Sequence, residues 1–188
     1  MNSIMDFDLK KLEDKMLKSV DVLKKEFSGL RTGRASVGLL EPIQVEAYGS
    51  KVPLSQVSAI SVPESRMLAV QVWDNSLING VENAIRSANL GLNPMTEGNL
   101  IRLPIPDLTE ERRKEIAKLA SKYSEETKIS VRNIRRDAMD TLKESEKNKE
   151  ISKDEFFQFS DVVQKLTDKI ISLIDDLFHE KEKDILQI

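Results

Sequence analysis

The chain of 188 residues contains no cysteine, one histidine and one tryptophan, and aromatic residues make up only 5% of it. The lack of cysteine excludes a disulfide framework, a thiolate zinc site and a cysteine nucleophile. Few aromatic residues beside 32% charged residues favour long helices over an all-β sandwich. No apolar run approaches the roughly 20 residues of a bilayer-spanning helix. We therefore expect a cytoplasmic protein with no membrane partner.

Catalytic signals are also scarce. The single histidine, His179, lies near the end of the last helical pattern, and no nucleophile–base pair can be assembled around it. There is neither a Walker A loop nor a G-x-G-x-x-G motif. Adjacent acids such as Glu125–Glu126 and Asp175–Asp176 are typical of a solvated helix surface rather than of a metal site. We expect no enzyme activity, no cofactor and no bound metal.

The net charge of -3 is unevenly distributed. Residues 107–148 carry ten acids and eleven bases, whereas residues 149–188 carry ten acids and six bases. A chain that is acidic overall does not coat nucleic acid through general attraction. Any nucleic-acid contact must therefore come from a local cluster of bases.

Three segments show the helical period. The first has apolar residues at steps of three and four from Leu9 to Leu30 and should end near Gly29–Gly33. The second begins at the N-cap residue Thr109 and continues to about Glu146. The third follows the capping box Ser152–Glu155. None of the three can bury its apolar stripe alone, so we predict an elongated antiparallel three-helix bundle.

The region between the first two helices differs in pattern. Alternating apolar residues and turn signals predict strands at 43–47, 67–73 and 100–103 and a short helix at 77–88. Gly49–Ser50 fits a two-residue hairpin turn, and Trp73 is expected in the strand core rather than as a base-stacking platform.

These patterns predict an α+β protein with two domains. The bundle domain comprises residues 1–30 plus 107–188, and the inserted β/α/β domain comprises residues 31–106. The chain crosses between them twice, with Gly33 at one crossing and Pro104 and Pro106 at the other. Glycine permits a turn and proline stiffens the exit, so we predict a hinge at these residues.

The most informative motif is KISVRNIRR. Its bases Lys128, Arg132, Arg135 and Arg136 are spaced i, i+4, i+7 and i+8, which places them on one face of a helix. At about 100° per residue, the expected core stripe lies roughly 150° away; it consists of Ile116, Leu119, Tyr123, Ile134 and Ala138. Lys114 and Lys118 extend the basic face backward. Planar guanidinium groups suit bidentate phosphate contacts, so RNA is the leading candidate ligand, and a merely solvated face is the alternative.

The roles of two further groups of residues cannot be decided from the sequence pattern. Arg31 and Arg34 at the first crossing either form a capped, solvated helix end or fix the hinge and touch the same RNA. Phe156, Phe157 and Phe159 cannot all face one core stripe, so at least one should be partly exposed. Together with the acidic last segment, these residues support an alternative function, a coiled-coil module that binds a protein partner.

Several long motifs identify a family. They are LRTGRAS at Leu30–Ser36, GLNP at Gly91–Pro94, IRLPIPDLTEERRKE at Ile101–Glu115, VRNIRRDAMD at Val131–Asp140 and DVVQKLTD at Asp161–Asp168. Through them the chain resembles bacterial ribosome recycling factor over essentially its whole length. One departure is DEFFQFS, where family members often have a charged stretch.

The resemblance implies both a fold and a function. It implies a three-helix bundle with an inserted β/α/β domain, roughly L-shaped, that acts as a monomer. It also implies binding to the post-termination ribosome and, with elongation factor G and GTP, its dissociation into subunits without hydrolysis by the factor itself. Large-subunit ribosomal RNA would be the main contact. By motif match, Arg132 and Arg135 would carry the main RNA contacts, with Lys128 and Arg136 beside them, and Arg31 and Arg34 match further basic positions. Lys114 of the basic face and the neighbouring Arg113 complete the candidate RNA-binding residues.

Overall fold

The computed structural model describes residues 3–186, with side chains from residue 9 onward. The described chain folds into two compact units, residues 3–27 with 118–183 and residues 28–117 with 184–186. We call the first the bundle unit and the second the β unit. Residues 1–2 and 187–188 of the predicted bundle domain lie outside the described residues. None of the described helices combines the length and the apolar character that crossing a bilayer requires.

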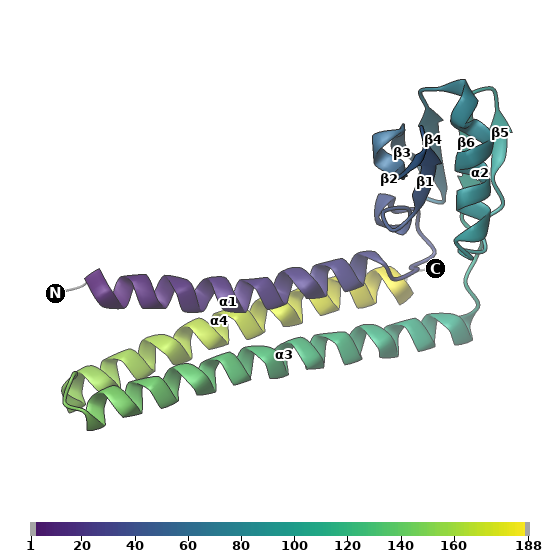
Figure 1. Cartoon of the computed structure of the whole chain (residues 1–188). Helices are drawn as coiled ribbons and strands as arrows, with labels where there is room; N and C mark the ends of the chain where they lie inside the picture. The colour runs from purple at the N-terminus through teal and green to yellow at the C-terminus, as the bar shows by residue number, and fades with distance from the viewer. Residues whose placement is uncertain (1–2, 187–188) are drawn as a thin grey trace. The chain divides into compact units, whose positions relative to one another are not determined.

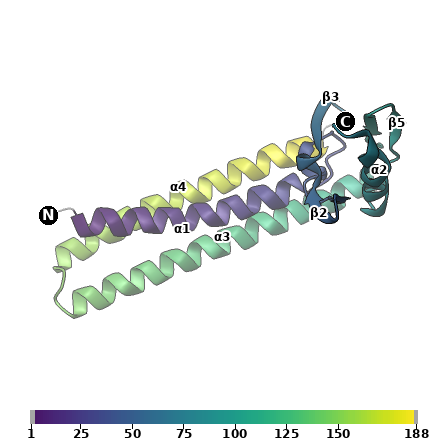
Figure 2. The ribbon, with the colours of Figure 1, turned by 45° about the horizontal axis from the view of Figure 1, so that its top comes forward.

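Three long helices form the bundle unit: α1 (Ser3–Ser28), α3 (Glu110–Lys147) and α4 (Lys153–Leu186). α1 and α4 run in the same direction and α3 runs opposite to both (Figures 1 and 2). The core contains Met16, Val20 and Leu23 from α1, Ala120 and Val131 from α3, and Val163, Ile170 and Ile174 from α4. The first eight residues of α3 belong to the β unit. The predicted α+β class with a helical bundle is confirmed.

Local hydrogen bonds explain where α3 ends and where α4 begins. The backbone N–H of Glu150 donates to the carbonyl of Ser145 (2.9 Å) and that of Lys149 to Glu146 (3.0 Å), with Lys149 in the left-handed region at φ 60°. This is a Schellman ending for α3. The predicted capping box of α4 is confirmed, because Ser152 N donates to Glu155 Oε2 (2.7 Å) and Glu155 N donates to Ser152 Oγ (3.2 Å).

The β unit contains a hairpin, a four-stranded sheet and one longer helix. The hairpin joins β1 (Gln44–Ala47) and β2 (Ser50–Pro53), and the antiparallel sheet has the order β3-β4-β6-β5. Its remaining elements are η1 (Val37–Leu39), η2 (Leu54–Gln56), β3 (Ser58–Glu64), β4 (Met67–Val72), η3 (Asn75–Leu77), α2 (Ile78–Ser87), β5 (Met95–Glu97) and β6 (Leu100–Pro104). The core cluster includes Val45 of β1, Leu68, Val70 and Val72 of β4, Val81 and Ile85 of α2, and Ile101 and Leu103 of β6. The pattern of the sequence did not predict β3 or β5 as separate strands.

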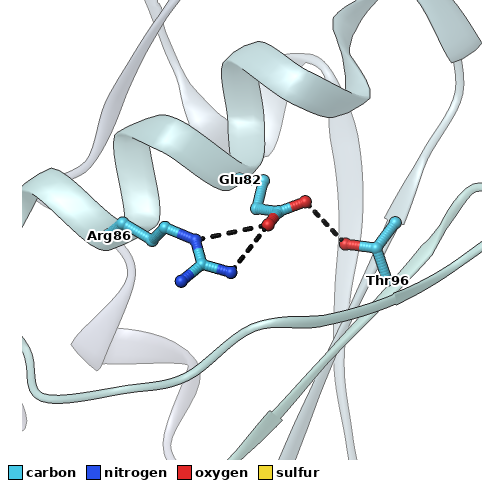
Figure 3. Close-up of polar contacts among 3 residues, drawn as sticks. All are labelled: Glu82, Arg86 and Thr96. Atoms are coloured by element: carbon cyan, nitrogen blue, oxygen red, sulfur yellow. Dashed lines mark hydrogen bonds and ion pairs between the residues drawn. The ribbon is translucent and has the colours of Figure 1, made fainter.

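A polar cluster attaches α2 to the short strand β5 (Figure 3). Glu82 accepts hydrogen bonds from Arg86 Nε (3.2 Å) and Nη2 (2.8 Å) and, on its other oxygen, from Thr96 Oγ1 (2.9 Å). These donors stabilise the carboxylate, with the Arg86 guanidinium contributing most, and lower the pKa of Glu82. The cluster adds side-chain hydrogen bonds to an edge strand of only three residues.

Two predictions for the β unit are wrong. The hairpin turn is Tyr48–Gly49 rather than Gly49–Ser50, since Ala47 pairs with Ser50 and both turn residues have positive φ (52° and 81°). This is a type I′ turn, which the twist of the flanking strands favours even with tyrosine at its first position. Trp73 is 63% exposed rather than part of the core. It follows Val72, which faces the core, and successive strand residues point to opposite faces.

Candidate nucleic-acid interface

The helix that carries the basic motif begins as the sequence predicts. The backbone N–H of Arg112 donates to Thr109 Oγ1 (3.2 Å), so Thr109 caps α3. Glu110 and Glu111 lie in its first turn, where the positive end of the helix dipole favours acids. Lys114 pairs with Glu110 at 2.9 Å, and both side chains are exposed. An exposed pair of this kind contributes little to stability.

The buried side of α3 in the bundle unit differs from the predicted apolar stripe. Ser124, Thr127 and Val131 are buried, whereas Leu119, which was expected in the core, is 37% exposed. Thr127 donates its hydroxyl proton to the carbonyl of Tyr123 (2.9 Å). A small side chain whose hydroxyl is hydrogen-bonded within its own helix can therefore be buried where two helices pack closely. By helical geometry, this buried stripe lies closer to the basic face than the predicted stripe.

Lys128 lies at the side of the basic face that borders α4. Its side chain is only 13% exposed, and its Nζ lies 2.5 Å from Asp175 Oδ1 on α4 and 3.2 Å from Glu125 Oε1. The bond to Asp175 is the main reason why the pKa of Lys128 is raised, and partial desolvation opposes it. Lys128 thus joins α3 to α4.

Arg135 lies on the same side of the helix and also binds α4. Its Nε donates to Gln164 Oε1 (2.7 Å), and Gln164 Nε2 in turn donates to Asp168 Oδ1 (2.8 Å). The side chain is part-buried. Two of the four bases in the motif therefore bind the neighbouring helix. The sequence pattern placed Asp175 in a solvated acidic pair and gave no signal for Gln164.

Arg132 and Arg136 lie on the open side of the basic face. Both are exposed, and neither makes an ion pair or side-chain hydrogen bond with any described residue. The nearby acid Asp140 pairs with Lys143 instead, at 3.9 Å. The spacing of i and i+4 places the two guanidinium groups on one strip of α3. We call Arg132 and Arg136 the open pair.

Further predicted bases lie in the β unit and contact its own chain segments. Arg34 Nη1 lies 3.7 Å from Asp184, and Arg113 Nη1 donates to the carbonyl of Ile185 (2.9 Å). Arg31 is half-buried, and its Nη1 would lie 3.3 Å from a Cβ atom at Gly91. Arg34 and Arg113 therefore have structural contacts within the β unit, and contact of all three arginines with RNA stays a prediction.

The predicted hinge residues all lie in the β unit. Gly33 has φ +78°, where a side chain is strained, and the Arg113 guanidinium would lie 3.5 Å from a Cβ atom added there. Pro104 is the last residue of β6 and pairs in register with Met67 of β4. Pro106 follows within the segment between β6 and α3. Both the hinge and the predicted domain boundaries stay predictions.

The alternative chemistries find little geometric support. His179 is 72% exposed and lies 3.8 Å from Glu182. Asp175 of the acidic pair on α4 binds Lys128. Within the described part of the chain, no three His, Cys, Asp or Glu side chains group in a way that suits a metal ion.

The phenylalanine cluster divides between the surface and the bundle. Phe157 is 59% exposed, while Phe156 and Phe159 are half-buried. The rings of Phe156 and Phe157 meet edge to face, with centroids 5.7 Å apart. The expectation that at least one of the three is exposed is confirmed.

Comparisons with known proteins agree on one family. The family model for ribosome recycling factor matches residues 23–186. A ribosome-recycling factor of Zymomonas mobilis is 59% identical over 175 residues, covering 93% of this chain and 95% of the relative. A solution structure of ribosome recycling factor is 45% identical with a TM-score of 0.79, and each chain is fully covered.

A second solved structure shows a family member in a larger assembly. It contains models of the T. thermophilus ribosome recycling factor and E. coli elongation factor G bound to the E. coli post-termination complex. This chain is 43% identical to its counterpart there, with a TM-score of 0.68, and the match covers 95% of this chain and 99% of the other.

Proposed function

Because the chain belongs to the ribosome recycling factor family, we propose that it binds the ribosome after termination and, with elongation factor G and GTP, promotes dissociation into subunits. The protein is a translation factor that takes part through binding. Its ligands are the post-termination ribosome and elongation factor G, the components of the assembly in which a 43% identical relative has been placed. GTP is used by the partner.

The open pair carries the RNA part of the proposal. Arg132 and Arg136 are exposed and make no ion pair within the described chain, so no carboxylate has to be displaced before phosphate binds. Each guanidinium offers a planar set of donors that fits two phosphate oxygens at once. Such contacts add counterion release to the free energy of binding. We assign the primary ribosomal RNA contact to these two residues.

Lys128 and Arg135 act mainly as positioning residues in this proposal. Their bonds to Asp175 and Gln164 fix α3 against α4, so the open pair is presented from a rigid surface. Arg135 retains unassigned donors that can extend to RNA at the edge of the same face. Arg31, Arg34, Arg113 and Lys114 form a second set of proposed contacts, in the β unit.

The proposed mechanism needs two rigid bodies. The bundle unit is anchored on large-subunit RNA, and the inserted domain of residues 31–106 swings about the hinge at Gly33, Pro104 and Pro106 when elongation factor G acts on it. The free energy that separates the subunits then comes from the difference between the contacts that the factor makes with the joined ribosome and those that it makes with the separated subunits. Shortening the segment Leu103–Pro106 should spare ribosome binding and abolish subunit splitting.

Sucrose-gradient sedimentation of post-termination ribosomes tests the function directly. We expect free subunits only when this protein, elongation factor G and GTP are all present. The double variant Arg132→Ala, Arg136→Ala should lose most of the splitting. A matched control, Lys165→Ala with Lys169→Ala, removes the same charge from exposed positions on α4 and should retain it. Equal splitting by both double variants would remove the open pair from the mechanism.

The exposure of Phe157 supports a second function class, a protein-interaction module that acts through α4. In that case a pull-down from cell extract would be insensitive to ribonuclease and lost in Phe157→Ala, while Arg132→Ala would have no effect. A ribonuclease-sensitive interaction that depends on Arg132 excludes this class.

A further inference from the structure

The β unit exposes the two largest aromatic surfaces of the described chain outside the bundle. Tyr48 is 80% exposed and Trp73 is 63% exposed. They lie 25 positions apart in the sequence, at the tip of the β1–β2 hairpin and just after β4. The hydroxyl of Tyr48 donates to Asp74 Oδ2, which brings the two segments together. We call Tyr48, Trp73 and Asp74 the aromatic platform.

Several contacts fix the backbone of this platform. Trp73 N–H donates to the carbonyl of Val57 (3.3 Å). Asp74 Oδ1 accepts from both the backbone N–H (2.9 Å) and the hydroxyl (2.7 Å) of Ser76 at the start of η3. Three donors thus converge on one exposed carboxylate. A surface fixed in this way loses little conformational entropy when a partner binds.

Tyr48 has an energetically unfavourable backbone conformation. It is in the left-handed region with φ 52°, where glycine and asparagine are readily accommodated and a bulky aromatic side chain is not. Burial of the ring does not offset this unfavourable conformation, because the side chain is mostly exposed to solvent. The hairpin turn requires a positive φ here but does not require tyrosine, so the exposed ring at this position points to a function at the surface.

The local charge argues for protein over RNA. The two segments that build the platform, residues 44–52 and 71–77, carry Glu46 and Asp74 but only one base, Lys51, and Lys51 pairs in register with Glu46. Donors from Tyr48 and Ser76 lower the pKa of Asp74, which remains ionised at neutral pH. A carboxylate repels phosphate, whereas a carboxylate bound by tyrosine and next in sequence to an exposed tryptophan suits a surface that presents the cation and stem of arginine or lysine.

We infer that the aromatic platform is a docking site for a protein surface of the ribosomal complex that presents an arginine or lysine side chain. The basic side chain donates to Asp74, which Tyr48 holds in place, and the surface around it contacts the exposed rings of Tyr48 and Trp73. Tryptophan and tyrosine are among the residues that most often contribute the largest share of the binding free energy at protein interfaces. The inference rests on the proposed function, since it takes the partner from the ribosomal complex, and it adds a second, protein-directed contact to the RNA contact of the bundle unit.

Photo-crosslinking distinguishes the two classes of partner. A benzophenone amino acid replaces Trp73, or Val62 as a control, because Val62 is 41% exposed on β3 of the same unit. Each protein is irradiated with purified post-termination ribosomes and elongation factor G. We expect an adduct from position 73 that resists ribonuclease, is destroyed by protease and exceeds the adduct from position 62. A ribonuclease-sensitive adduct, or one no stronger than the control, overturns the inference.

Binding of variants to the same complex completes the test. Trp73→Ala should weaken binding about 10-fold or more, Tyr48→Phe by less, and Val62→Ala not measurably. Binding of Trp73→Ala at the wild-type affinity contradicts the inference while leaving the proposed function intact. If the unsubstituted protein fails to bind ribosomes at all, the proposed function and this inference both fail.

Discussion

The two units of this protein present their candidate binding residues in different ways. In the bundle unit, Arg132 and Arg136 come from consecutive turns of one helix, and their sequence spacing alone places them side by side. In the β unit, Tyr48 comes from the turn of the two-stranded hairpin and Trp73 from the end of a strand of the four-stranded sheet, and one hydrogen bond joins their segments. Helical surfaces can therefore be predicted from the sequence, whereas a surface shared by two sheets requires their packing against each other.

The largest effect that bears on this comparison is expected from truncations in the two cores. Ile174→Ala in α4 and Ile101→Ala in β6 each remove a fully buried side chain and should cost about 2–5 kcal/mol. If the units are stable independently, each substitution accelerates hydrogen exchange mainly in its own unit. Exchange measured by mass spectrometry checks this, and equal acceleration in both units with either variant would mean that they unfold together.

A smaller effect separates positioning residues from binding residues on α3. Lys128→Met breaks the ion pair with Asp175 and should cost about 1 kcal/mol in the free energy of unfolding, because both partners keep some contact with solvent. Lys165→Met, at a side chain that is 75% exposed, should change it by less than about 0.5 kcal/mol. Urea denaturation measures both. Equal stabilities would contradict the structural role assigned to Lys128.

The smallest effect concerns the aromatic platform and pH. The folded-state pKa of Asp74 is lowered, so its contribution to stability is present above the unfolded-state pKa of aspartate and is lost as pH falls through the folded-state value. Tyr48→Phe removes the largest cause of that shift. The variant should therefore be slightly less stable than the wild type at neutral pH and indistinguishable from it in strong acid. Thermal denaturation at both pH values checks this, and a difference that grows in acid would contradict it.

Much of the fold follows from local signals in the sequence. The capping box at Ser152–Glu155 and the N-cap Thr109 place the starts of two helices because each motif satisfies backbone donors within a few residues. The edge strands β3 and β5 lack such signals. They are defined by pairing with β4 and β6, which depends on the rest of the sheet.

The candidate site was predicted only in part, for two physical reasons. Thr127 lines the buried side of α3 although it is polar, because its hydroxyl bonds within the helix, and an apolar pattern overlooks such a residue. Lys128 shares a face with Arg132 on the helix, yet a neighbouring helix covers one side of that face. Trp73 is a different case, since the inward alternation of Leu68, Val70 and Val72 already implied that it points away from the core.

The central claim is that the open pair contacts ribosomal RNA while Lys128 supports the bundle. The most direct test is the salt dependence of binding to the large ribosomal subunit, plotted as the logarithm of the binding constant against the logarithm of the salt concentration. The double variant Arg132→Ala, Arg136→Ala should bind more weakly and lose about one unit of slope for each phosphate contact removed, whereas Lys128→Met should keep the wild-type slope. An unchanged slope in a correctly folded double variant would contradict the account.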